Sequence, residues 1–143
     1  MALHLLKLCV GAESIQDLED WIAETRAEAL ARGREPEQIH TTRMVPNRRD
    51  EILDGGSLYW VIKGEVACRQ RLLDIRPFVD GDGIRRCHLV FEPVVHRVDP
   101  RPSRPFQGWR YLAAKDAPAD LGARSEAPLP DELRRELRSL GLI

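Results

Sequence analysis

Three consecutive stretches between residues 55 and 93 carry the alternation of β-strands, and they constrain the fold more than any other part of the chain. The first alternates from Leu58 to Ile62, and a second β-rich run follows it after a glycine. An Asp-Gly-Asp-Gly sequence at 80–83 supplies the positive φ angles that a tight hairpin needs before the third stretch. The pattern predicts a three-stranded antiparallel meander in which Leu89 and Phe91 are buried.

The apolar phase changes within the second stretch. Val66 and Cys68 share one face, whereas Leu73 and Ile75 lie on the other. A β-bulge at 70–72 accounts for the change, and bulges of this kind are common where a sheet curls into a barrel.

The segments around the meander contribute both helices and strands. Before it, we expect a strand at 2–10, a helix from Ser14 to Gly33 with Trp21 and Leu30 widening its apolar stripe, a strand at 39–45 and a short helix at 47–54 capped by Asn47 and ended by the pair Gly55-Gly56. After it, we expect a surface loop at 93–105 because of its four prolines, an aromatic strand at 106–111, an Ala/Pro-rich connector at 113–129 and an amphipathic helix at 130–143. The predicted fold class is α+β, a small curled and mostly antiparallel sheet or barrel with two or three helices. A single domain is expected over 1–112.

Length and composition are those of one soluble globular domain. The chain has 143 residues, 43% of them hydrophobic and 31% charged, and no apolar run is long enough to span a membrane. Lys7 interrupts the apolar N-terminus, which alternates like a strand and not like a signal peptide. The expected location is therefore the cytoplasm, without a membrane partner.

Metal and cofactor motifs are sparse. Three cysteines at wide spacing favour neither a disulfide framework nor paired metal knuckles. Cys87 and His88 are adjacent, so on a strand they face opposite sides and cannot ligate one ion together. Asp80 and Asp82 resemble half of a calcium loop, but no glutamate follows at its far end, and a hairpin turn explains them better. No metal and no cofactor are expected.

The middle of the chain is its basic part. Residues 40–110 hold thirteen Lys/Arg against nine Asp/Glu, and Lys63 is the only lysine among the thirteen. Arginine suits bidentate contacts with phosphate, but a genome rich in G and C also favours arginine codons. Both explanations remain open at this level.

Polar and aromatic residues around the basic segment are candidates for a ligand site. Rings such as Trp109 offer faces on which a base can stack, although they serve equally well in a core, as we expect of Trp60. The predicted ligand- or nucleic-acid-binding residues are His40, Thr42, Arg43, Arg48, Arg49, Lys63 and Trp109.

Four sequence strings carry a resemblance to a known family. They are TTRMVPNRRDEILDGGSLYWVIKG, RQRLLDI, DGDGIRRC and RPFQGWRYL. Together they resemble DUF1489, a mainly alphaproteobacterial family to which no activity is assigned, over residues 1 to about 115. The order of elements is also similar to PUA-like domains, including the ASCH and EVE families, which are small β-barrels that bind RNA or modified bases in a cleft beside their helices.

The resemblance implies an RNA- or nucleotide-binding module with a basic, aromatic-lined cleft. One ASCH branch hydrolyses acylated cytidine with a lysine, a threonine and a glutamate, so a small hydrolase acting on a modified nucleobase is an alternative. The candidates for these catalytic roles here are Thr42, Lys63 and Glu65. The lysine expected just before the threonine is replaced by His40 or Ile39, so Lys63 would have to substitute for it. A further alternative is a protein interaction module that docks through its C-terminal helix.

Overall fold

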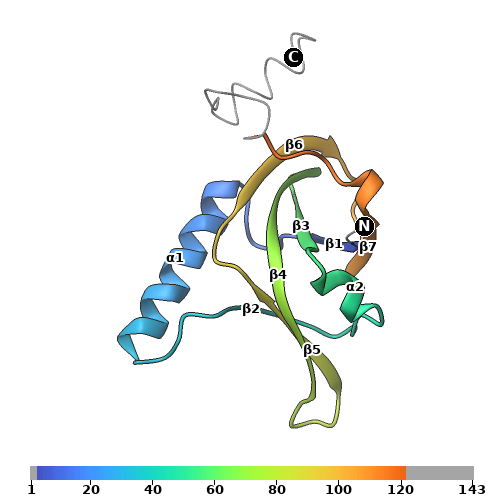
Figure 1. Ribbon diagram of the computed structural model, residues 1–143. Coiled ribbons are helices and arrows are strands. Elements are labelled where there is room, and N and C mark those ends of the chain that lie inside the picture. Colours follow the sequence, from blue (N-terminus) through green and yellow to red (C-terminus); the bar gives the residue numbers. More distant parts are fainter. Residues whose placement is uncertain (1–2, 122–143) are drawn as a thin grey trace.

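The computed structural model describes residues 3–121, which form one curled sheet of seven strands flanked by two helices (Figure 1). The strands are β1 (Leu3–Leu8), β2 (Gln38–Thr42), β3 (Ser57–Ile62), β4 (Glu65–Val79), β5 (Arg85–Phe91), β6 (His96–Pro102) and β7 (Trp109–Ala113), and the helices are α1 (Ile15–Ala31) and α2 (Arg49–Leu53). The predicted α+β class is confirmed. The strand order β2-β5-β4-β3-β1-β7 ends in two different edges, so the sheet is open and does not reach the predicted closure into a barrel.

The predicted meander is β3, β4 and β5. All three pair antiparallel, the Asp80–Gly83 turn joins β4 to β5, and Leu89 and Phe91 are buried, as predicted. The only parallel pair among the described strands is β1 with β3.

The long strand β4 organises the sheet because it pairs along both edges. Its N-terminal half lies between β3 and β6, and its C-terminal half pairs with β5. The register with β5 shifts between Leu72 and Asp74, which places the bulge at Leu73, just beyond the predicted 70–72. A second irregularity lies between Val66 and Cys68. These bulges bend β4 enough for one strand to serve two parts of the curl (Figure 1).

The proline-rich segment 93–105 is not the loop that we predicted, because His96–Pro102 forms β6. Among the described strands it pairs with β4 alone, and its other edge forms an isolated antiparallel bridge between Val98 and Asp120, where the Asp99 N–H donates to the Ala119 carbonyl. Proline lacks an N–H donor and is tolerated on such an edge strand. The prolines limited the strand to an edge and did not prevent it.

Helix α1 begins as predicted and packs less than predicted. The Ser14 hydroxyl accepts a hydrogen bond from the backbone N–H of Asp17. Ile15, Leu18 and Ile22 are buried, but Trp21 and Leu30 are about half exposed and do not belong to the buried stripe. The C-terminal half of α1 therefore extends past the core.

Helix α2 begins without the predicted Asn47 cap. Arg48 occupies the cap position with no side-chain cap hydrogen bond. The backbone N–H of Asn47 instead donates to the Tyr111 hydroxyl. At the other end, the Gly56 N–H donates to the Ile52 carbonyl, and Ile52 is fully buried.

The core lies on both faces of the sheet. One large cluster fills the inside of the curl, where Leu5, Leu58 and Trp60 pack with residues of both helices. A smaller cluster around Tyr59 and Val98 lies on the opposite face. All residues of β3 are consequently buried.

The described part of the predicted connector is packed against the sheet. A 3-10 turn at Ala114–Asp116 follows β7, and both carboxylate oxygens of Asp120 accept hydrogen bonds from Arg69, at 2.8 and 2.7 Å. The rest of the connector and the predicted helix at 130–143 lie outside the described residues. Within 3–121, no helix is both long enough and apolar enough to cross a membrane.

Candidate functional site

The two open edges of the sheet, β2 and β7, are held together by side chains and not by a strand ladder. The Trp109 indole N–H donates to the Met44 carbonyl at 2.8 Å, and the Thr42 hydroxyl donates to the same oxygen at 3.0 Å. Further along, the Tyr111 hydroxyl accepts the backbone N–H of Asn47. We call this junction between β2 and β7 the seam.

A lysine lies on the core-facing side of β1 beside the seam. Side chains alternate along a strand, and Leu3 and Leu5 precede Lys7 on the face that points into the core. Lys7 is the register partner of Trp60 on β3 and of Trp109 on β7. Lys7 therefore follows two buried leucines on the same face of β1, and a tryptophan occupies the paired position on each neighbouring strand.

Lys7 belongs to a hollow that runs along the seam, which we call the seam hollow. It has a volume of about 520 Å³. The residues that line it are Lys7, Thr41, Thr42, Arg43, Met44, Gln107, Gly108 and Trp109. None of these described residues has a carboxylate side chain.

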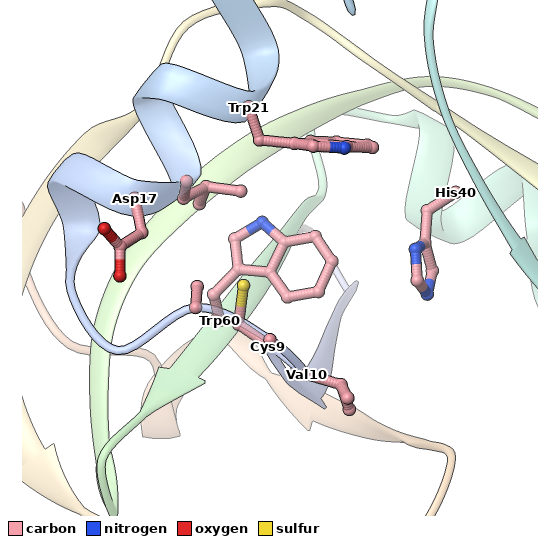
Figure 2. Close-up of a pocket in the computed structure, with 9 residues that line it drawn as sticks. Cys9, Val10, Asp17, Trp21, His40 and Trp60 are labelled. Carbon is pink, nitrogen blue, oxygen red and sulfur yellow. The ribbon is translucent and has the colours of Figure 1, made fainter.

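A second hollow, the helix hollow, lies between the end of β1 and the start of α1. Its volume is about 360 Å³, and Figure 2 shows Trp60 in its centre, Trp21 of α1 on one side and His40 on another. The His40 and Trp60 rings meet edge to face with their centroids 5.6 Å apart. The two hollows share no lining residue, but they are neighbours, because Lys7 of the seam hollow is the register partner of Trp60 and lies near enough to His40 to affect its pKa, and we call the pair of hollows the cleft.

The Trp60 ring is fixed at the floor of the helix hollow. Only 4% of it is exposed, and its indole N–H donates to the buried Gln70 side chain at 2.9 Å. Gln70 in turn donates to the Glu92 carbonyl. Trp60 is therefore a core residue, as predicted, whose remaining surface faces a cavity.

The cleft lowers the pKa of both of its basic strand residues. Burial, together with the nearby positive charge of Lys7, lowers the pKa of His40 to about 4. Burial also lowers the pKa of Lys7. His40 is consequently neutral at pH 7, and its ring can accept or donate a hydrogen bond without carrying charge.

Two cations at the cleft have no protein partner. Within the described part of the chain, the side chains of Lys7 and Arg43 form no hydrogen bond or ion pair. Asp17 lines the helix hollow, but its carboxylate accepts the backbone N–H of Glu13 at 3.0 Å. The seam hollow therefore presents the positive charges of Lys7 and Arg43 without a carboxylate among its described lining residues, while Asp17 brings one negative charge to the helix hollow.

The structure brings together four of the predicted ligand-binding residues and separates the other three. Thr42, Arg43 and Trp109 line the seam hollow, and His40 lines the helix hollow. By contrast, Arg48 pairs with Glu51 and lies over the Tyr111 ring at 5.7 Å, while Arg49 pairs with Asp74 and donates to the Ile75 carbonyl. Lys63 is in the exposed two-residue turn between β3 and β4. These last three residues line neither hollow of the cleft.

The predicted catalytic set is not assembled. Glu65 pairs in the sheet with Ile62 and Pro102, and neither it nor Lys63 lines the hollow that contains Thr42. Thr42 is only 7% exposed, and its hydroxyl already donates to the Met44 carbonyl. Lys7 is the lysine that shares a hollow with Thr42.

Sequence reasoning missed Lys7 and Trp21 as members of the site. Lys7 carried a usable signal, because a charged residue breaks the apolar side of the alternation Leu3, Leu5, Lys7. Trp21 carried a misleading one, because its helical spacing placed it in the apolar stripe, whereas it is 47% exposed at the rim of the helix hollow. Both positions become site residues only when β1, α1 and β2 are seen together.

The searches of curated proteins and of solved structures gave no match. A family model described as "Protein of unknown function (DUF1489)" matches residues 5–143, nearly the whole chain and beyond the stretch that the sequence strings cover. The chain therefore belongs to the DUF1489 family.

Proposed function

We propose that the protein binds RNA or a nucleotide in the cleft formed by the seam hollow and the helix hollow. One observation carries this proposal: Lys7 and Arg43, which have no hydrogen-bond or ion-pair partner among the described side chains, line the seam hollow, and the half-exposed ring of Trp21 lines the helix hollow beside it. Cations contact phosphates, and ring faces stack on bases.

The shape and charge of the cleft support a ligand of this kind. Its hollows, of about 360 and 520 Å³, fall in the range of small-ligand sites. Trp21 and His40 add an exposed ring and a neutral hydrogen-bonding ring at the rim. Of the acidic residues of α1, Asp17 lines the helix hollow, whereas Glu24 and Glu28 are exposed on the helix and line neither hollow.

The arrangement of elements supports the similarity to PUA-like domains. A curled, mostly antiparallel sheet carries a cleft beside a helix, and in that group of proteins such a cleft holds RNA or a modified base. A hydrolase that used Thr42 would first have to withdraw its proton from the Met44 carbonyl. Binding without turnover is therefore the function that the geometry favours over hydrolysis.

The test is the affinity for a labelled single-stranded RNA oligonucleotide, measured by fluorescence anisotropy at several salt concentrations. Changing Arg43 to Ala should weaken binding at low salt and reduce the slope of log K against log salt by about one unit. Arg85→Ala is the matched control, because Arg85 is also exposed but lies at the far β4–β5 hairpin (Figure 1). Equal losses in both variants, or no binding by the wild type at low salt, would contradict the proposed function.

A further inference from the structure

We infer, building on the proposed function, that Lys7 binds the terminal phosphate of the ligand, so that the cleft accepts a nucleoside monophosphate or a phosphorylated strand end. The chemistry recognised is a phosphate monoester attached to a base-bearing nucleoside. An internal phosphodiester is not the expected ligand group.

The Lys7 side chain is half-buried in the seam hollow. It lies on the face of β1 that Leu3 and Leu5 direct into the core, and its two register partners are tryptophans. An ammonium group removed from water is destabilised unless an anion accompanies it. Lys7 is half-buried, and no carboxylate is among the described residues that line the seam hollow, so an anion bound there would supply the partner that Lys7 lacks. The lowered pKa of Lys7 agrees with this unpaired burial.

The charge of the seam hollow matches that of a phosphate monoester. Lys7 and Arg43 line the same hollow and together carry a charge of +2 when both are protonated. A phosphate monoester carries about −1.5 to −2 at pH 7, whereas an internal phosphodiester carries about −1. The monoester therefore matches the two cations, and arginine and lysine are the usual partners of a phosphate group.

The space around Lys7 also limits how many nucleosides can extend from a phosphate bound there. Lys7 lines the seam hollow, and it is near enough to His40 of the helix hollow for its charge to lower the pKa of that ring, while the Trp109 indole N–H donates to the Met44 carbonyl across the seam. A terminal phosphate needs one nucleoside to extend from it, towards the rings of the helix hollow. An internal phosphate needs two exits from the same place, one on each side of a seam that side chains hold closed.

The experiment compares ligands that differ only in the phosphate. Isothermal titration calorimetry would measure the affinity of wild-type protein for each of the four nucleoside 5′-monophosphates, the four nucleosides and inorganic phosphate. The best monophosphate should bind at least tenfold more tightly than its nucleoside. Lys7→Gln should abolish this difference, and Lys63→Gln, a change of the same type in an exposed turn, should preserve it.

A second measurement does not depend on the variant folding. NMR of the lysine side chains of the wild type should show the Lys7 amine pKa rising towards its ordinary value of 10.5 when the monophosphate is added. No such change is expected with the nucleoside alone.

Two RNA hexamers, one with a 5′-phosphate and one with a 5′-hydroxyl, distinguish a strand end from a free nucleotide as the source of the phosphate. They also distinguish failure of this inference from failure of the proposed function. Tighter binding of the 5′-phosphorylated hexamer than of the 5′-hydroxyl hexamer supports a strand end, and tight binding of the free monophosphate with no preference between hexamers supports a free nucleotide. If both hexamers bind equally, neither is affected by Lys7→Gln, and monophosphates bind no better than nucleosides, this inference is overturned while the proposed function stands. If only inorganic phosphate binds, both are overturned.

Discussion

Gly56 is the position where one added methyl group should disturb the fold most clearly. A Cβ atom there would lie well inside contact distance of two backbone carbonyl oxygens, those of Ile52 in α2 and Leu3 in β1. Neither oxygen can move away as a flexible side chain does, so α2 and β1 would have to separate. Gly55, its neighbour, has open space at the same atom but a φ of +88°.

The two glycines therefore predict different costs for the same substitution. Forcing extra atoms into a packed site costs about 1–3 kcal/mol, and backbone neighbours place Gly56→Ala at the upper end. A left-handed backbone costs an alanine roughly 1–2 kcal/mol at Gly55. Each variant regains about 0.4–1 kcal/mol because alanine restricts the unfolded chain. The expected losses are about 2–2.6 kcal/mol for Gly56→Ala and about 0–1.6 kcal/mol for Gly55→Ala.

Urea unfolding followed by tryptophan fluorescence would measure both values. The slope of the unfolding free energy against urea should stay the same in each variant, so that the midpoints report stability directly. If Gly55→Ala destabilises the protein as much as Gly56→Ala, the close approach of α2 and β1 does not limit this position and the reasoning fails.

Three further predictions concern the core, acid stability and the cleft. Phe91→Ala removes a buried ring whose centroid is 5.9 Å from that of Trp60 and should cost about 3–5 kcal/mol in a thermal or urea melt, and a loss below about 1 kcal/mol would place Phe91 outside the core. Hydrogen bonds from Arg69 hold the pKa of Asp120 below its ordinary 3.8, so this carboxylate stabilises the fold above that pH and the contribution is lost as the pH falls further. Asp120→Asn should therefore lower stability at pH 7 by about 1 kcal/mol and flatten the acid part of the stability profile, whereas an unchanged profile would show that the pair contributes nothing. NMR titration should give His40 a pKa of about 4, so that stability present above 6.5 declines as the pH falls towards 4, and a measured value near 6.5 would mean that the ring is solvated.

The meander could be predicted from the sequence because each of its signals is local. Alternation from Leu58 to Ile62 and the Asp-Gly turn fix strands and connection without reference to the rest of the chain. The Gly55-Gly56 pair likewise marked the end of α2. Its two distinct roles, a positive φ at one residue and a close approach at the other, depend on where Leu3 lies and were not visible in the sequence.

The edge strand β6 shows where local signals mislead. Four prolines between residues 93 and 105 indicated a loop, yet a strand at the edge of the sheet, paired with only one other strand, accommodates them. The partner that makes this segment a strand is the N-terminal half of β4, which lies 27 or more residues earlier in the chain. Long-range pairing decided the outcome over local preference.

About half of the candidate site could be predicted, because proximity along the chain is visible in the sequence and long-range pairing is not. His40, Thr42 and Arg43 share one strand and its end, so their proximity follows from sequence, and Trp109 was chosen for its ring. Arg48 and Arg49 looked equally suitable, but their carboxylate partners Glu51 and Asp74 are revealed only by the fold. A charge in the sequence is available to a ligand only if no neighbouring side chain has already paired with it.

The most direct test of the central claim, that the cleft binds RNA or a nucleotide, is NMR chemical-shift mapping of the full chain with a single-stranded RNA oligonucleotide at low salt. The indole N–H signals of Trp60 and Trp109 and the backbone amides of Thr42 and Arg43 should shift together and saturably, because these groups surround the two hollows. Shifts confined to residues outside the cleft, or no shifts at any RNA concentration, would contradict the claim.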